Sequence, residues 1–337
     1  MVCGWPIPLG QSPRAEDAGT GLVGETGGMS DVELSAADFR ALYERVKQLS
    51  RWGPADRRGA LNNISPAERV AAASEVRCGR VVSLAAQVEN HPAPDNPEPA
   101  VHQMTHPGTS PVRVAGLSFV MDRLAMNVHG YVDSHIDALC HVIFDGTLYN
   151  GIAADAVTAE GATELSIKVA SEGIVGRGLL LDIPRVRRVR WLEPGEHVTA
   201  DDLIAAEALE EVRIQRGDLL FVRVGHRSRR SMLGPWDATD TRAGLHPAAL
   251  ELLAERQIAV LGSDSNSDTA PSTAEGVDFP VHVLAINAMG VHLLDWLRFD
   301  DLVTACEELK RWSFLCVIAP LRLAAGTGSP VNPIAIF

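Results

Sequence analysis

The sequence predicts a mixed α/β fold with one folded domain over residues 31–337. Apolar segments of strand length are interspersed with a few segments of helical periodicity, and neither recurs with a fixed period. The chain has 337 residues, of which 46% are hydrophobic, so it can fill a sizeable core. We therefore expect an α/β domain without internal repeats.

The N-terminal 30 residues differ in composition from the rest of the chain. They are rich in Gly, Pro and small polar residues, and we expect them not to fold. Met29 is followed by Ser30 and Asp31 and then by a predicted helix at 36–49. We hypothesise that translation starts at Met29.

A second helix is predicted from Ser65 to about Val76. Ser65 and Glu68 have the spacing of a capping box, and Pro66 occupies the first helical position. The other predicted helices are 201–209, 246–256 and 300–312. Strands are predicted at 81–84, 116–121, 124–137, 178–183, 218–224, 258–262 and 314–320. The segment 91–111 is too polar and too rich in Pro for the core, and its length suggests a substrate lid.

Charge and motifs exclude several functions. The net charge of −13 and the pI of about 5.3 argue against nucleic-acid binding, which concentrates positive charge. We interpret the Arg-rich runs 185–190 and 227–230 as solvated faces or subunit contacts, and not as anion sites. The chain has neither a dinucleotide-binding Gly motif nor a phosphate-binding loop, so nucleotide chemistry has no support.

Cysteine usage and hydropathy suggest a cytoplasmic protein. The five cysteines are odd in number and lack paired spacing, so a disulfide framework is not expected. Cys140 and Cys316 lie in apolar runs and are predicted to be small buried side chains. No apolar run reaches the length of a membrane span, and the first 28 residues lack the pattern of a secretion signal.

One segment carries most of the chemistry. In an extended strand alternate side chains share a face, so the predicted strand 124–137 would present five side chains together. These side chains are His129, Tyr131, Asp133, His135 and Asp137. Burying two carboxylates and two imidazoles is costly unless they are compensated, and a divalent cation compensates them directly. The spacing therefore predicts a metal site, with a structural polar network or a barrel rim as the alternative.

His141 follows Asp137 by four residues and can return over the same site from a turn. A bound cation lowers the pKa of its water toward neutrality. A neighbouring imidazole can then move protons between that water and a leaving nitrogen. We expect His141 to be this general acid and base.

The run from Ser134 to His141 resembles the signature His-x-Gly-Thr-His-x-Asp-x-Pro-x-His of the cyclase family, which includes bacterial kynurenine formamidase and isatin hydrolase. The resemblance extends from about Trp52 to the C-terminus. Weaker matching pieces occur in the family's order at 52–62, 177–182, 217–220, 262–264, 280–282 and 327–333.

The resemblance implies roles for individual residues. His135 and Asp137 would be metal ligands, Asp137 could bridge two ions, and His141 would be the proton donor and acceptor. His282 would be a distal ligand, although alone it would be interpreted as a core histidine. Asp295 stands near the position where the family usually has a glutamate and would be a further metal ligand. The alternative interpretation is an ordinary helix-capping or surface acid.

Three positions depart from the family pattern. Tyr131 replaces its first histidine, Asp133 its Gly and Leu139 its Pro. Either His129 or Asp133 supplies the missing ligand, or the site holds one ion. Trp52 and Tyr131 are the candidate substrate-binding residues, and Trp52 would form an aromatic wall for a planar substrate unless it packs in the core.

These observations together predict a metal-dependent hydrolase of a non-peptide amide, either an N-formyl arylamine or a cyclic amide or imide. Imidazole and carboxylate ligands suit Zn²⁺ or Mn²⁺. The resemblance implies a swivelling β/β/α fold and a homodimer or homotetramer acting on a small molecule. The alternatives are a polyketide-type ring cyclase or dehydratase that uses the same metal site, and a degenerate relative without catalysis.

Overall fold

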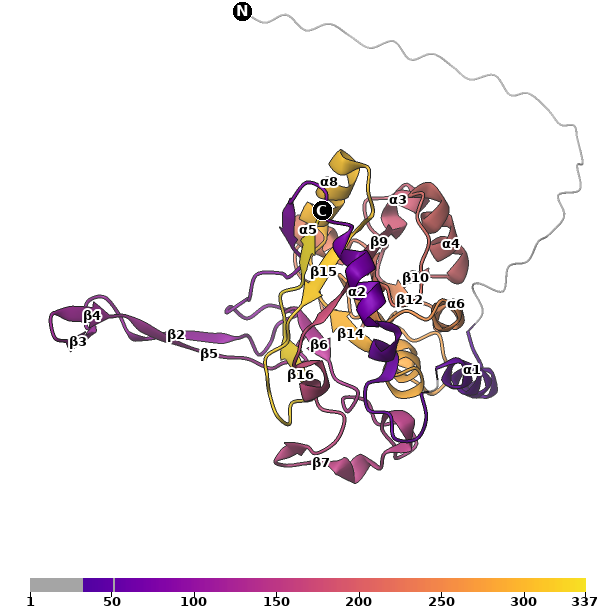
Figure 1. Cartoon of the computed structure of the whole chain (residues 1–337), viewed down its shortest axis with the longest axis horizontal. Coiled ribbons are helices and arrows are strands. Elements are labelled where there is room, and N and C mark those ends of the chain that lie inside the picture. Colours follow the sequence, from indigo (N-terminus) through magenta and orange to yellow (C-terminus); the bar gives the residue numbers. More distant parts are fainter. Residues whose placement is uncertain (1–32, 51) are drawn as a thin grey trace, which may run out of the picture. The chain divides into compact units, whose positions relative to one another are not determined.

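The computed structural model describes residues 33–50 and 52–337. The expectations for residues 1–30 and for Met29 as the start lie outside these residues. Within the described chain a curled nine-stranded sheet forms the centre of the fold (Figure 1). Its strands, in spatial order, are β1 (Val81–Ser83), β17 (Ile334–Ile336), β15 (Ser313–Ile318), β9 (Ile174–Asp182), β11 (Leu219–Arg223), β13 (Val260–Ser263), β14 (His292–Asp295), β6 (His135–Asp137) and β16 (Gly328–Pro330).

The strand directions divide this sheet into a parallel centre and antiparallel flanks. β9, β11, β13 and β14 run parallel to one another. On one side β6 pairs antiparallel with β14, and β16 pairs antiparallel with β6. On the other side β15 pairs antiparallel with β9, β17 with β15, and β1 with β17. The central strands are buried along almost their whole length, which is typical of parallel strands covered on both faces. The predicted mixed α/β fold is confirmed.

Helices cover the sheet. The α-helices are α1 (Ala36–Leu49), α2 (Pro66–Ala73), α3 (Ile183–Arg187), α4 (Ala200–Leu209), α5 (His226–Leu233), α6 (Ala249–Glu255), α7 (Pro280–His282) and α8 (Asp300–Leu309). Short 3₁₀ turns are η1 (Gly59–Asn63), η2 (Tyr149–Gly151), η3 (Ala154–Ala156) and η4 (Ile167–Ala170), and η5 (Val283–Ala288) is π-helical. None of the helices in the described ranges has both the length and the apolar character needed to cross a bilayer.

The two N-terminal helices follow their sequence signals. Ser65 and Glu68 form the predicted capping box at the start of α2, which packs on β9 and β15. In α1, Phe39, Leu42 and Val46 recur at helical spacing and are buried, and the helix packs against α6 and η5. Cys140 and Cys316 are buried, as predicted.

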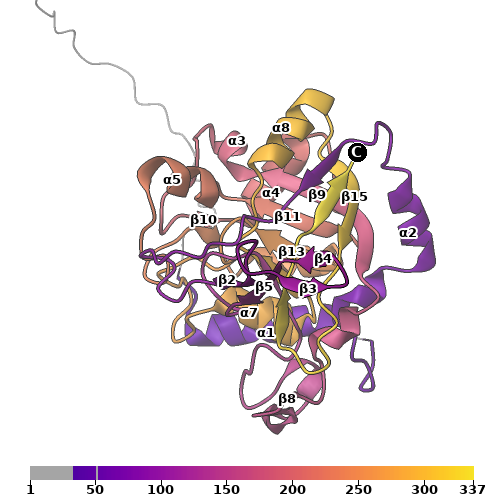
Figure 2. The same ribbon diagram turned by 90° about the vertical axis from the view of Figure 1, so that its left-hand side faces the viewer.

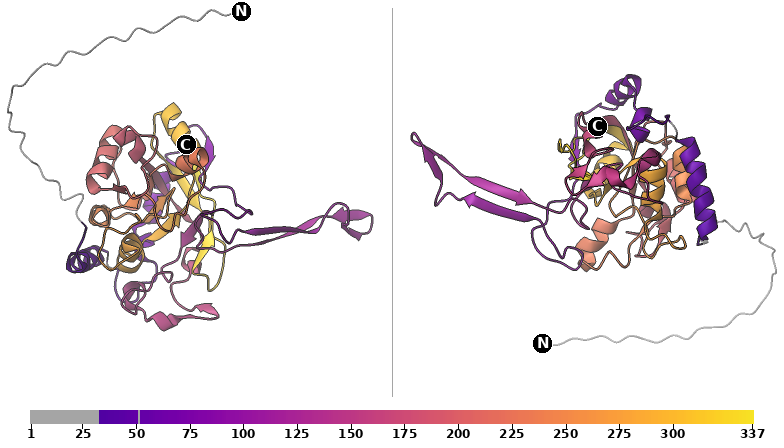
Figure 3. Two further views of the ribbon diagram at one scale, coloured as in Figure 1. Left: turned by 180° about the vertical axis from the view of Figure 1, so that it is seen from behind. Right: turned by 90° about the horizontal axis from the view of Figure 1, so that it is seen from below.

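A long hairpin arm, residues 101–125, stands away from the sheet (Figure 1), and Figure 2 looks along this arm toward the body. Strands β2 (Val101–His106) and β5 (Met121–Ala125) pair in it, and so do β3 (Val112–Val114) and β4 (Leu117–Phe119). The view from behind and the view from below both show the arm clear of the body (Figure 3). The prediction of an irregular lid at 91–111 is therefore wrong over β2, because those residues pair with β5. Two further small ladders join β7 (Val157–Thr158) to β8 (Gly161–Ala162) and β10 (His197–Val198) to β12 (Gly244–Leu245).

The predicted strand 124–137 is also wrong as a continuous element. It consists of the end of β5 and of the three-residue β6, with bends and turns between them. Asp133 explains part of the interruption, because its side chain accepts a hydrogen bond from the backbone N–H of Glu89 at 3.0 Å. Helices α3, α5 and α7 were not predicted.

Candidate metal centre

The candidate site lies where the parallel strands β13 and β14 end beside β6. The segment 264–268 follows β13, and Asp295 ends β14. The antiparallel register places Asp295 directly opposite His135, so their side chains share a face of the sheet. The carboxyl ends of strands in an open α/β sheet are a usual place for ligand sites.

Asp137 is the centre of a buried cluster of histidines and carboxylates. Its side chain is 1% exposed, and its Oδ1 lies 2.8 Å from His129 Nδ1 and 3.6 Å from His135 Nε2. Its Oδ2 lies 3.5 Å from His282 Nε2 and has no hydrogen-bond partner in the described chain. A buried carboxylate oxygen without a donor is unfavourable unless something else binds it.

Two groups of potential metal ligands share Asp137. The ligand atoms of His135, Asp137 and Asp295 all lie within 4.8 Å of one another, and the same holds for His129, Asp137 and His141. Each group contains the imidazole and carboxylate ligands that zinc and manganese accept. The cluster could therefore hold one cation in either group, or two that share Asp137.

His129 and His141 lie face to face. Their ring centroids are 3.7 Å apart and their planes differ by 8°. His129 Nε2 lies 2.9 Å from Thr327 Oγ1, so both of its ring nitrogens have hydrogen-bond partners. A Cβ on Gly328 would lie 2.8 Å from His129 Cε1, so a glycine at this position leaves room for the His129 ring.

His282 and Asp295 also lie close to Asp137. His282 Nε2 lies 3.3 Å from Asp295 Oδ2, and its Nδ1 lies 2.5 Å from Asp268 Oδ2. Asp295 also accepts hydrogen bonds from Asn266 Nδ2 and Ser267 Oγ, both at 3.0 Å. These three partners of Asp295 come from α7 and from the segment after β13, and His135 and Asp137 of β6 also lie close to it.

The electrostatics of the cluster require positive charge. Within the described ranges the ion-pair partners of Asp137, Asp268 and Asp295 are histidines. The nearby buried Arg242 donates to the backbone carbonyl of Asp268 and not to a carboxylate of the cluster. Burial lowers the pKa of His282, but the neighbouring carboxylates of Asp137, Asp268 and Asp295 outweigh it and hold that pKa well above its usual value. A divalent cation would supply the same positive charge, so the residues present fit a metal ion.

Asp137 and His141 are held in the protonation states that a metal site needs. Burial would raise the pKa of Asp137, but His141, His129, His282 and His135 hold it well below its usual value. Burial lowers the pKa of His141 to about 4, so its imidazole is neutral at pH 7. A neutral imidazole can accept a proton or bind a cation.

The cluster opens into a cavity of about 560 Å³. The polar wall carries the histidines and carboxylates described above. Its other wall is mainly apolar and includes Tyr131, Val142, Ile143, Phe144, Val277 and Phe279. A concave site with a few convergent polar groups and aromatic walls suits a small planar substrate.

Comparison with known proteins gives the family. The model of the cyclase family matches residues 66–268, which is more than half of the chain. The chain belongs to the cyclase family. This confirms the resemblance drawn from the segment 134–141.

Solved structures of similar proteins agree with this family. A novel cyclase is 27% identical, with a TM-score of 0.76 over 88% of this chain and 99% of that one. Isatin hydrolase A from Ralstonia solanacearum is 21% identical, with a TM-score of 0.54 over 76% of this chain and 91% of that one. A predicted metal-dependent hydrolase from Bacillus stearothermophilus is 20% identical, with a TM-score of 0.50 over 77% and 98%. The last two share the fold. No curated protein matches the chain.

In this cyclase-family chain the fold brings most of the predicted site residues together. His129, His135, Asp137, His141, His282 and Asp295 all line the cavity. Tyr131 also lines it, and its ring lies 5.9 Å from that of Trp296. Asp133 does not join the cluster, because its carboxylate binds the backbone of Glu89.

Trp52 lies apart from the candidate site. It lines a different cavity, of about 350 Å³, together with Lys47, Pro54 and Tyr149, and it packs against the core. Trp52 comes only a few residues after α1, and its short distance along the chain from that helix keeps it beside η1 and η2. The structure therefore does not bring Trp52 to the substrate cavity.

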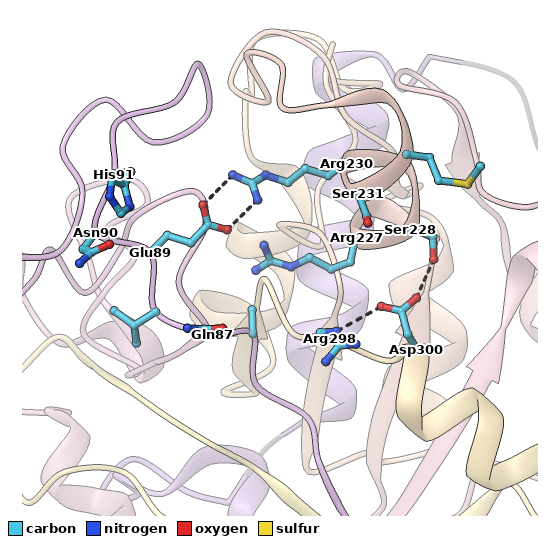
Figure 4. A pocket seen from close by; sticks show the side chains of 13 residues that line it. Gln87, Glu89, Asn90, His91, Arg227, Ser228, Arg230, Ser231, Arg298 and Asp300 are labelled. Atoms are coloured by element: carbon cyan, nitrogen blue, oxygen red, sulfur yellow. Dashed lines mark hydrogen bonds and ion pairs between the residues drawn. The ribbon is translucent and has the colours of Figure 1, made fainter.

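The sequence patterns did not point to Asp268, Asn266 or Ser267, and they gave Thr327 no role beyond the matching piece 327–333, yet all four contact the predicted residues. A signal was present in the polar run 264–268 directly after a buried strand. Arg227 was also misjudged, because it is 7% exposed and not on a solvated face. It reaches from α5 toward the segment 87–91, beside the Arg230–Glu89 ion pair (Figure 4).

Arg227 connects the two strands that carry His135 and Asp295. Its Nη2 donates to the carbonyls of Val132 and Trp296, and its Nε donates to Leu297 O at 3.2 Å. Val132 precedes β6 and Trp296 follows β14. The guanidinium therefore holds the backbone on both sides of the cluster.

Proposed function

We propose that this cyclase-family chain is a metal-dependent hydrolase of a non-peptide amide, either an N-formyl arylamine or a cyclic amide or imide. The observation that carries the proposal is the buried cluster around Asp137, which lacks a Lys or Arg partner in the described chain and opens into an aromatic-walled cavity. Buried acids in such a setting need a cation.

His135, Asp137, His282 and Asp295 would hold Zn²⁺ or Mn²⁺, and His129 lies beside them as a further ligand. When bound, the cation polarises a carbonyl oxygen and lowers the pKa of water. Asp268 forms a hydrogen bond with Nδ1 of His282. The other nitrogen of that ring, Nε2, therefore faces Asp137 and Asp295. A carboxylate that hydrogen-bonds the far ring nitrogen of a ligating histidine orients that ring.

His141 would be the general acid and base. Its ring lines the cavity, and burial keeps its imidazole neutral near pH 7. A neutral imidazole can take a proton from the attacking water and return it to the leaving nitrogen. Stacking on His129 fixes the orientation of the ring.

The apolar wall favours an aryl substrate. Tyr131, Phe144 and Phe279 offer flat surfaces in the same cavity as the charged residues, and rings pack well on such surfaces. The fold shared with isatin hydrolases is the reason for including isatin among the trial substrates.

A second candidate function is ring closure or dehydration by the same polarised carbonyl. The cyclase family match and the 27% identical novel cyclase favour considering it. The third candidate is that the chain is a degenerate member of the family that has lost catalysis. A cytoplasmic location and a homodimer or homotetramer remain predictions.

The test is elemental analysis of wild type and His135→Ala, combined with turnover of formylated anilines, isatin and cyclic imides. We expect at least one ion per chain in wild type after metal-supplemented expression, hydrolysis of at least one amide, and loss of both in His135→Ala. His91→Ala is the matched control, because His91 is exposed and outside the cluster. Less than one ion per wild-type chain would refute the proposal, and a full metal complement without amide turnover would favour ring closure.

A further inference from the structure

A separate cavity of about 730 Å³ is lined mainly by α5 and by residues 86–91 (Figure 4). It shares no lining residue with the candidate substrate cavity. Its charged lining residues have a formal charge of +1, whereas the whole chain carries −13; they are Arg227, Arg230, Arg298, Glu89 and Asp300. A cavity of positive charge in an acidic chain is a candidate site for an anion.

Arg227 carries a buried charge without a carboxylate partner. Its Nε and Nη2 donate only to backbone carbonyl oxygens, and in the part of the chain that the structure describes none of its partners is an acid. Burial, and to a smaller extent the charge of Arg230, lowers the pKa of Arg227 to about 10, although Glu89 and Asp264 oppose this shift. A buried cation in this setting is stabilised by an anion that can reach it.

The acids that line or adjoin the cavity are already bound to other arginines. Glu89 and Asp95 both form ion pairs with the guanidinium of Arg230, at 2.6 and 2.5 Å. Asp300 forms an ion pair with Arg298 Nε at 3.4 Å. The place of an opposite charge beside the buried guanidinium is therefore open to a ligand.

The remaining nitrogen of Arg227, Nη1, opens onto the cavity. It has no hydrogen-bond partner within the described ranges, and it is not among the unpartnered polar atoms that are closed off from solvent. Figure 4 shows the guanidinium directed into the space between Glu89 and Arg298. Because three carbonyls hold the other two nitrogens, Nη1 is fixed in place before a ligand arrives, which reduces the cost of binding.

The rest of the lining selects the class of anion. Glu89 and Asp300 place negative charge in the same cavity, so a dianion such as sulfate is repelled more strongly than a monoanion. Val88 and Met232 add exposed apolar surface, at 44% and 58%. A carboxylate accepts strong, charge-assisted hydrogen bonds from guanidinium N–H groups. The lining therefore suits a monocarboxylate with a small apolar body.

We propose that this cavity is a second binding site, for a small monocarboxylate whose oxygen accepts a hydrogen bond from Arg227 Nη1 and whose apolar body lies against Val88 and Met232. The run 227–230, which the sequence led us to interpret as a solvated face or a subunit contact, then contributes to an anion site. The proposal does not depend on the proposed hydrolase activity.

Isothermal titration calorimetry of the full, metal-supplemented chain with 4-bromobenzoate measures the binding. We expect a dissociation constant of about 1 mM or tighter, as for a ligand of this size, and weaker binding of sulfate. Arg227→Met also removes the donor from buried carbonyls, so the informative variant is Ser231→Asp. This variant adds a negative charge at the cavity from an exposed position, and it should weaken binding of 4-bromobenzoate at least ~10-fold.

Leu233→Asp is the matched control for the added charge. It places the same charge on α5, at a side chain that is 61% exposed and outside the cavity. Solvent and salt screen a charge there, so binding should stay within about threefold of wild type. Far-UV circular dichroism and the unfolding temperature verify that both variants keep their fold.

Crystals soaked in 4-bromobenzoate locate the ligand, because bromine gives an anomalous signal. A carboxylate can also bind a cation in the cluster around Asp137, and the bromine position distinguishes the two sites. We expect a bromine peak beside Arg227, Val88 and Met232. A peak only in the substrate cavity, no binding by wild type up to about 10 mM, sulfate that binds as tightly as the carboxylate, or a Ser231→Asp variant that binds like wild type would each overturn the proposal.

Discussion

His282 Nδ1 lies 2.5 Å from Asp268 Oδ2 in the interior of the site. Asp268 is fully buried and also accepts the backbone N–H groups of Val281 and His282, at 2.6 and 3.1 Å. The carboxylate thus fixes both the start of α7 and the ring that α7 presents. With Nδ1 engaged, Nε2 is the nitrogen that faces Asp137 and Asp295.

Asp268→Asn should weaken metal binding by about 10- to 100-fold, the range observed when partners of ligating histidines are removed. Chelator competition measures the affinity. Asp264→Asn is the matched control, because Asp264 is equally buried and accepts two backbone N–H groups, those of Val224 and Gly225. Equal loss of affinity in both variants would show that Asp268 has no special role.

His141→Ala should keep its metal and lose turnover, with kcat lowered by about 10²- to 10⁴-fold, as is usual for a missing acid or base. The physical reason is that His141 lines the cavity, whereas the ligand group of His135, Asp137 and Asp295 does not include it. Metal content and kcat are measured on the same preparation. A fully active variant would refute the proton shuttle, and loss of metal would make His141 a ligand.

Arg227→Met should destabilise the protein by about 2–4 kcal/mol, because it leaves buried carbonyls without donors. It should also lower metal affinity, since Arg227 holds Val132 and Trp296, which flank β6 and β14. Urea unfolding and chelator competition measure the two effects. Arg229→Met on the same helix is the control, because Arg229 contacts the exposed Glu193 and should cost less than about 1 kcal/mol. Unchanged metal affinity in Arg227→Met would remove the positioning role.

Glu210 should make stability fall as the pH rises from about 4.5 to 8. Burial raises the pKa of its carboxyl to about 8, and its Oε2 has no hydrogen-bond partner in the described chain. Above pH 4.5 the unfolded carboxyl ionises while the folded one stays protonated, so the stabilisation present at low pH is lost progressively until the folded group ionises. Glu210→Gln should flatten the free energy of unfolding over this window. An unchanged pH dependence would contradict the shift.

The sequence pattern predicted the centre of the site better than its surroundings. His135 and Asp137 were placed on one strand face, and β6 holds them there. His129 was expected on the same strand, yet it reaches Asp137 from the turns before β6. Alternation within a strand could not reveal this, because tertiary contacts to Thr327 and Asp137 position the ring.

Contacts between residues that are far apart in the sequence could not be predicted from local sequence patterns. Asp268 and His282 are 14 positions apart and belong to different elements, so no periodicity connects them. Arg227 stands in a run of basic residues that resembles a solvated face, and its burial depends on contacts with Val132, before β6, and Leu297, after β14. The arm was predicted partly as a loop because its strands are exposed and lack a buried face.

Anomalous X-ray diffraction at the zinc and manganese absorption edges, from crystals of metal-supplemented protein, tests the metal centre most directly. We predict an anomalous peak bounded by Asp137, Asp295, His135 and His282, with a second peak beside His129 and His141 if Asp137 bridges two ions. Crystals with no anomalous peak in this cluster, or with peaks only elsewhere on the chain, would contradict it.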